Sequence, residues 1–155
     1  MGWAHAYRGW RRAALGAAML CLSVPALAAD DEACGKADFE AVVEEAATGL
    51  RDLNTENKPK FQDRLRQLKT KRGWKHDQFM REAAPFVMDD KITEYDQSIE
   101  ELLGAIASMG QEGAAAKKPD CALLLELRAR MRVLVETQTA KWTYMFGKID
   151  AELAK

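Results

Sequence analysis

Histidine, cysteine and proline are scarce in this chain of 155 residues, which holds two, three and four of them respectively. Four prolines are too few for a proline-rich disordered chain. The cysteines form no Cys-x-x-Cys pair, which argues against a zinc site, a redox motif and covalently attached c-type haem. Glu-x-x-His pairs, calcium-loop spacing and glycine-rich phosphate loops are also missing. None of the short motifs that reveal a catalytic or metal site is therefore in the sequence.

The N-terminal 28 residues have the pattern of a secretory signal peptide. Three arginines come first, a largely apolar run of 12 residues follows at 13–24, and Ala-Leu-Ala at 26–28 supplies a small-x-small cleavage site. We expect cleavage there, export to a bacterial periplasm or beyond the cell, and a single mature domain at 29–155. An uncleaved anchor and export by the twin-arginine route are the alternatives. No later run is apolar enough to span a membrane.

Loss of the leader would leave a domain with a net charge of -4 and two cysteines, Cys34 and Cys121. An exported protein of this charge is a poor candidate for binding nucleic acid. Two cysteines in an exported chain predict one disulfide, here closing a loop of 88 residues when both ends are counted. An intermolecular bond or two buried thiols are the other readings.

Apolar residues recur at helical spacing through the mature domain, and no stretch alternates as a strand would. We expect one helix ending near Leu53, a polar break at 54–57, and a second helix with Pro59 in its first turn and Gly73 at its C-terminus. A short third helix would cover 75–84. Pro85 would either start a further helix or kink a continuous one.

The second half of the chain has the more regular pattern. From Met88 to Met109 apolar residues follow steps of four and three, as in a coiled-coil seam, which suits either an internal core or a homodimer. A flexible connection is expected at 110–119. Asp120 is then a good N-cap for a long last helix over 121–154. The fold class predicted is all-α, a bundle of four or five helices.

The disulfide constrains how these helices can be arranged. Both cysteines lie at helix N-termini, which stand at opposite poles of a plain up-down-up-down bundle, tens of ångströms apart. Disulfide-bonded Cα atoms lie only about 5–6 Å apart. We therefore expect an irregular topology in which the first and last helices are roughly parallel at their starts.

Charge is distributed unevenly, and a basic strip lies between two acidic regions. Residues 58–75 have a net charge of +7, whereas 30–56 carry -7 and 82–101 carry -6. The candidate binding residues are those of the strip and its aromatic end: Lys60, Arg64, Lys71, Trp74, Lys75 and His76. They suit an anionic envelope component or an acidic protein. The alternative is that the strip only neutralises the neighbouring acidic helices.

The function expected from these features is non-enzymatic: an exported helical protein that acts in binding, as an adaptor or like a chaperone. We assign no catalytic residue, metal or cofactor. A helical bundle that binds haem or a small ligand is one alternative, with His76 as a ligand. A small helical enzyme with a buried polar site is another, and Arg128, Arg132 and Gln138 are the kind of residues it would use.

Overall fold

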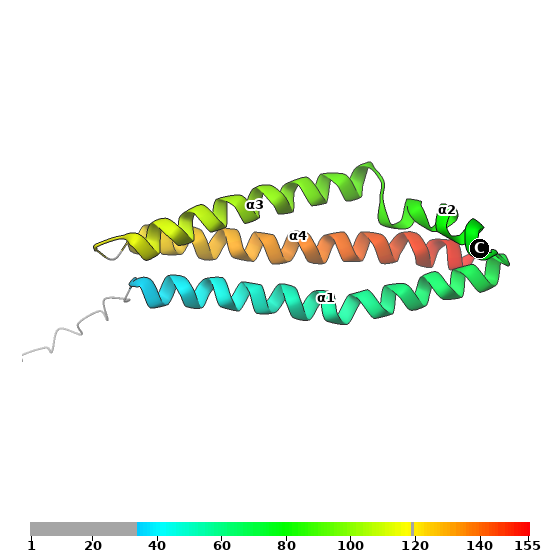
Figure 1. Cartoon of the computed structure of the whole chain (residues 1–155), viewed down its shortest axis with the longest axis horizontal. Coiled ribbons are helices and arrows are strands. Elements are labelled where there is room, and N and C mark those ends of the chain that lie inside the picture. The colour runs from blue at the N-terminus through cyan, green and yellow to red at the C-terminus, as the bar shows by residue number, and fades with distance from the viewer. Residues whose placement is uncertain (1–33, 119) are drawn as a thin grey trace, which may run out of the picture.

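The computed structural model describes residues 34–118 and 120–155, and these form four helices with no strand among them (Figure 1). The helices are α1 (Lys36–Arg72), α2 (His76–Val87), α3 (Asp90–Ala115) and α4 (Cys121–Ala154). The expected all-α fold is confirmed. The predicted leader at 1–28 lies outside the described residues. In the part that is described, no helix is both long and apolar enough to cross a bilayer.

Three long helices form the body of the molecule and α2 covers one of its ends. The chain runs out along α1, turns through α2, returns along α3 and runs out again along α4 (Figure 1). A disulfide joins Cys34 to Cys121, with their Cα atoms 5.0 Å apart. The first and last helices therefore start side by side and run parallel, as expected. We call this the disulfide end, and the end covered by α2 the distal end.

α4 is the central helix, and it carries most of the core. Its buried side chains recur every three or four residues from Leu124 to Leu134 and again at Met145 and Ile149, as expected for an amphipathic helix. Near the disulfide end it packs against α1 and α3 in a cluster that includes Phe39, Ile106 and Leu127. Near the distal end a second cluster includes Leu68, Phe86 and Ile149.

The predicted polar break at 54–57 is wrong, because α1 is continuous and contains Pro59. The two asparagines of this segment have hydrogen-bond partners within the helical arrangement. The side-chain amide of Asn57 donates to the Leu53 carbonyl at 2.8 Å, and Asn54 Oδ1 accepts from Trp142 Nε1 of α4 at 3.1 Å. α1 bends partway along (Figure 1), which is the usual effect of a proline inside a helix. Burial of Phe61 and Leu68 beyond the proline holds the second half of α1 on the core.

The ends of α2 and α3 also differ from the predictions. Pro85 does not start a further helix, since it lies inside α2, and the helix that contains it is not continuous with α3, because α2 ends two residues later at Val87. Met88 belongs to an extended link and is 73% exposed, so it is not part of the seam, whereas Ile92 and Ile106 are buried as predicted. The connection predicted at 110–119 is shorter, because α3 continues to Ala115.

Two capping predictions are confirmed. Gly73 ends α1 with φ of 66°, a left-handed conformation that glycine adopts without strain, and the N–H groups of Gly73 and Trp74 donate to carbonyls of the last turn. The Asp120 carboxylate accepts from Leu123 N–H at 2.9 Å at the start of α4.

Candidate functional site

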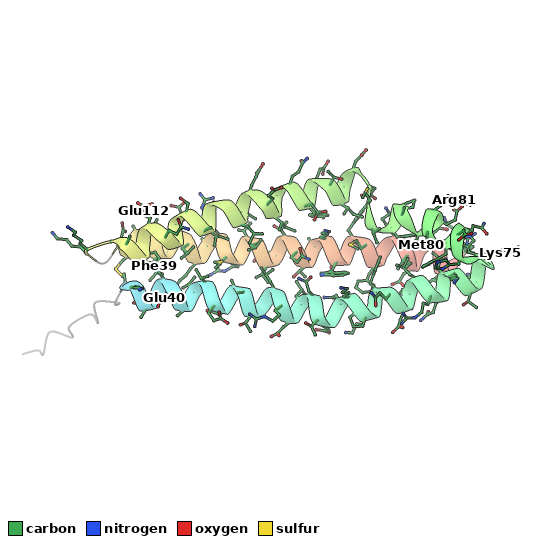
Figure 2. All side chains as sticks on the ribbon, in the orientation of Figure 1. Phe39, Glu40, Lys75, Met80, Arg81 and Glu112 are labelled. Carbon is green, nitrogen blue, oxygen red and sulfur yellow. A yellow bond between two sulfur atoms is a disulfide. The ribbon has the colours of Figure 1, made fainter. Side chains whose placement is uncertain are left out.

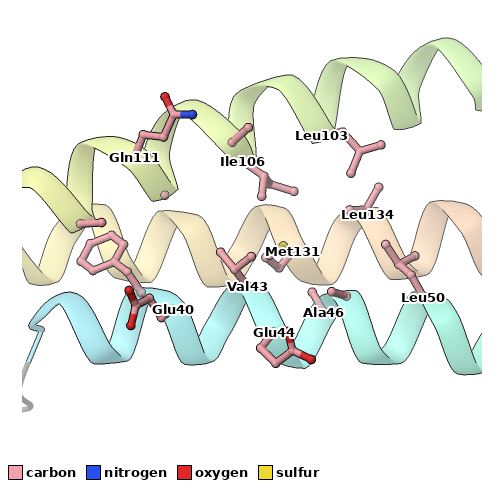
Figure 3. A pocket seen from close by; sticks show the side chains of 15 residues that line it. Glu40, Val43, Glu44, Ala46, Leu50, Leu103, Ile106, Gln111, Met131 and Leu134 are labelled. Atoms are coloured by element: carbon pink, nitrogen blue, oxygen red, sulfur yellow. The ribbon is translucent and has the colours of Figure 1, made fainter.

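An apolar groove lies between the first half of α1 and the second half of α3, with α4 as its floor. Figure 3 shows Val43 and Leu50 on the α1 wall and Leu103 on the α3 wall, with Met131 and Leu134 of α4 between the two walls. The volume of the groove is about 550 Å³. We call it the α1–α3 groove.

The groove exists because the helix walls carry small residues. Ala47 of α1 and Ala107, Gly110 and Ala114 of α3 line it, so little side-chain volume fills the space between the two helices. Part of its apolar lining is open to solvent: Val43 is 37% exposed and Leu103 is 47% exposed. In a four-helix bundle a fourth long helix would cover such a face, whereas here the fourth helix, α2, is short and lies at the distal end. Exposed apolar surface of this kind marks binding sites more often than isolated exposed residues do.

The groove is closed near the disulfide end by a direct contact between α1 and α3. The ring of Phe39 lies against Gly113 so closely that a Cβ on residue 113 would be 2.1 Å from the ring. Phe39 is 1% exposed, so this contact is buried. The glycines that the sequence placed in a flexible connection instead allow two helices to approach.

The polar residues on the rim of the groove are acidic or neutral. Glu40, Glu44 and Gln111 line it, and none of the lining residues is basic. Within the described residues the ion pairs of the two glutamates are long, exposed and internal to α1, Glu40 with Lys36 at 3.5 Å and Glu44 with Arg51 at 3.8 Å. Such exposed pairs contribute little. The wider walls are acidic too, with five acidic and two basic residues in 36–53, and six acidic and one basic in 90–115.

The structure places the sequence-predicted basic strip away from this groove, on the distal half of α1. Several of its residues have partners within the molecule. Lys60 pairs with Glu56 at 2.5 Å and Arg64 with Asp150 of α4 at 3.3 Å, while Lys71 Nζ donates to the Leu153 carbonyl at 2.5 Å. The expectation that the strip neutralises acidic neighbours therefore accounts for Lys60 and Arg64. Lys71 keeps its charge, because a carbonyl does not neutralise it.

The other predicted residues gather near the link between α1 and α2. Trp74 is half-buried against the distal core cluster, whereas Lys75 and His76 are exposed at the start of α2. Figure 2 shows Lys75 at this end, beside Met80 and Arg81. His76 is roughly 30 Å along α1 from the groove. The groove and His76 therefore do not form one haem site, and no cluster of potential metal ligands occurs within 34–118 and 120–155.

The residues considered for an enzyme do not converge on one point. Arg128 and Arg132 line a smaller depression between α1 and α4 together with Glu45. Gln138 instead donates to Asn54 Oδ1 at 3.1 Å, nearer the middle of the bundle. Asn54 also accepts from the Trp142 indole, so this amide joins α1 to α4.

The largest shift of a pKa occurs at the link between α2 and α3. A hydrogen bond from Lys148 of α4, together with the Ile92 N–H and the Tyr144 hydroxyl, lowers the pKa of Asp89 from 3.8 to about 2. Lys148 also donates to the Pro85 carbonyl. Asp89 and Lys148 thus attach the α2–α3 link to α4 and fix where α2 lies.

Replacing Asp89 by asparagine is expected to lower the melting temperature at neutral pH. Asparagine removes the negative charge that attracts Lys148, but its side-chain oxygen can still accept from the Ile92 N–H and cap α3. The folded-state pKa is depressed, so the stabilisation is present above about pH 4 and is lost as the pH falls through about 2. The melting temperatures of the unchanged protein and of Asp89→Asn should therefore converge as the pH falls from about 4 to about 2. Asp90→Asn, at an exposed position one residue on, is the control. An equal effect of both variants at pH 7 would exclude the Lys148 contact as the cause.

The residues of the α1–α3 groove were not recognised from the sequence. The available signal was the width of the apolar face of α3, where Leu103, Ala107, Gly110 and Ala114 repeat beside the predicted seam. Comparison with known proteins adds no assignment, since no protein-family model, curated protein or solved structure matches this chain.

Proposed function

We propose that this protein is a non-enzymatic helical binding protein, an adaptor or chaperone, that receives an amphipathic helix with basic flanks in the α1–α3 groove. The observation that carries the proposal is the open apolar groove with an acidic rim. An amphipathic helix buries its apolar stripe in such a groove and leaves its polar face in water.

The dimensions of the groove support a helix as its occupant. Its α1 wall extends from Phe39 to Leu50, which corresponds to about 17 Å or three helical turns. Three turns supply apolar anchors at positions i, i+3, i+4, i+7 and i+8. An occupant that lies over Val43 and Leu103 would bury the apolar surface that is exposed in the free protein.

Charge supports a basic partner over the alternatives. Lys or Arg beside the apolar stripe would lie close to Glu40 and Glu44. A second copy of the chain that used the same face would bring these acidic rims together, which is unfavourable. A fatty acid would find no cation for its carboxylate among the lining residues.

We also propose that the protein acts outside the cytoplasm, in the periplasm or secreted. The N-terminal pattern supports this, and so does the disulfide, because such bonds persist mainly in oxidising compartments. The alternative with a specific observation in its favour is binding of a small apolar ligand, since about 550 Å³ lies within the range of small-molecule sites.

Fluorescence anisotropy with two designed peptides tests the proposed function. Both peptides are 18-residue amphipathic helices with the same leucine stripe, and they differ in having lysine or glutamate beside it. We expect the lysine peptide to bind at least about tenfold more tightly, a difference of about 1.4 kcal/mol. Raising the salt concentration should narrow that difference.

Two groove variants and one control make the test specific. Val43→Glu and Leu103→Glu each place a charge in the groove and should weaken binding of the lysine peptide. Leu125→Glu adds the same charge on α4 at a residue that is 58% exposed and does not line the groove, and should bind as the unchanged protein does. Equal binding of both peptides would contradict the role of the acidic rim. A groove that binds an apolar dye but neither peptide would replace the proposal with the small-ligand alternative.

A further inference from the structure

The distal end has an exposed apolar surface that the groove does not include. Met80, Ala84 and Val87 share one flank of α2, and Met88 follows them in the link to α3. Met80 is 62% exposed, Val87 45% and Met88 73%. We call these four residues the α2 flank. The inner side of the same helix packs through Phe86, the one α2 residue that is buried.

Basic residues near the α2 flank outnumber acidic ones, and several are not neutralised. Residues 58–90 hold nine basic and five acidic residues, and two of the acidic ones, Asp89 and Asp90, directly follow Met88. Arg64 and Arg72 pair with Asp150 and Glu152 of α4. Within the described residues, Lys75 and Arg81 have no ion-pair partner. Lys71 donates only to a carbonyl, and Lys69 lies 5.4 Å from the centre of the Phe79 ring.

The excess of positive over negative charge lies in this half of the molecule. The walls of the α1–α3 groove are acidic, so the charge changes sign along the long axis (Figure 1). A protein with this distribution is oriented by an anionic surface, with its distal end towards that surface. The groove would then stay in solution and accessible.

We propose that the distal end docks on an anionic lipid bilayer, with Met80, Val87 and Met88 entering the headgroup region and Lys75 and Arg81 contacting lipid phosphates. Exposed apolar residues beside unpaired cations are the combination by which helices lie on membranes. Each cation near an anionic bilayer contributes about fivefold to binding. An acidic protein would satisfy the cations but gives no reason for methionines this exposed, and for that reason we favour lipid.

Co-sedimentation with vesicles tests the proposal. We expect the protein to bind vesicles that contain phosphatidylglycerol, to bind vesicles of phosphatidylcholine alone much more weakly, and to dissociate as salt is raised. Lys75→Glu combined with Arg81→Glu should reduce binding at least about tenfold. Met80→Ser combined with Met88→Ser should reduce it severalfold while leaving the charge unchanged.

The matched controls lie elsewhere on the molecule. Lys117→Glu with Lys118→Glu makes the same change of charge at the disulfide end, and Leu125→Ser removes an exposed apolar side chain from α4. The N-terminal residues are the same in every variant, so any contribution they make to vesicle binding is the same too. Differences in vesicle binding among the variants therefore report on the substituted residues. Equal loss in the Lys117 and Lys118 variant would overturn the proposal. The proposal would also be overturned if the protein bound polyglutamate as tightly as it binds vesicles and if the methionine substitutions left that binding unchanged. An acidic protein would then be the favoured partner. Either result leaves the peptide-binding test of the groove independent.

Discussion

Replacing Cys34 and Cys121 by serine is expected to lower the free energy of unfolding by about 4–5 kcal/mol. The bond closes a loop of 88 residues, counting both cysteines, so it removes much conformational freedom from the unfolded chain. It also holds the starts of α1 and α4 together, where Cys34 is 3% exposed and the core cluster begins. For a domain of this size the loss is comparable with a large part of the total stability.

Chemical denaturation with and without reductant measures this effect. Reduction of the unchanged protein should lower its stability by nearly as much as the double substitution, and reductant should have no effect on the double variant. The same transition in oxidised and reduced protein would show that the two helix starts are held by packing alone. Because the groove closes near this end, we also expect the reduced protein to bind the lysine peptide more weakly.

Gly113→Ala is expected to destabilise the protein, although alanine favours helices more than glycine does. The added Cβ would lie 2.1 Å from the ring of the buried Phe39, so the ring or the helix would have to shift. Overpacking of this kind costs about 1–3 kcal/mol. Gly104→Ala in the same helix is the matched control, because nothing lies within 4 Å of its added Cβ. That control should gain about 0.5–1 kcal/mol from helix propensity.

Thermal or chemical unfolding of the two variants separates the effect of the overlap with Phe39 from the effect of helix propensity. A combined Gly113→Ala and Phe39→Leu protein should recover part of the lost stability, since the smaller side chain relieves the overlap; the recovery measures the coupling of the two positions. If Gly113→Ala were as stable as Gly104→Ala, α1 and α3 would not be in close contact at this point. The claim that the Phe39–Gly113 contact closes the groove would then be wrong.

The last helix could be predicted from the sequence because it depends on local signals, and the disulfide because the expected exported domain holds only two cysteines. The Asp120 cap and the apolar period along 121–154 are independent of what packs against them, and α4 has the predicted bounds. Pairing of the two cysteines then required the first and last helices to start together. The parallel arrangement of α1 and α4 confirms that argument.

The predictions that were wrong concern features that depend on tertiary contacts. A proline after a polar stretch favours a helix start, but Phe61 and Leu68 pack on the core and keep α1 continuous through Pro59. Gly110 and Gly113 favour a loop until α1 is known to lie against them. The groove could not be predicted for the same reason, since it depends on how far α1 and α3 separate above α4.

The central claim, that the α1–α3 groove receives a basic amphipathic helix, is tested most directly by NMR titration of the labelled protein with the lysine peptide. We expect the amide shifts to change first at groove residues such as Val43, Ala47, Leu103 and Ala107, with the α2 flank unaffected. Changes centred on α2, or spread evenly over all four helices, would contradict the claim.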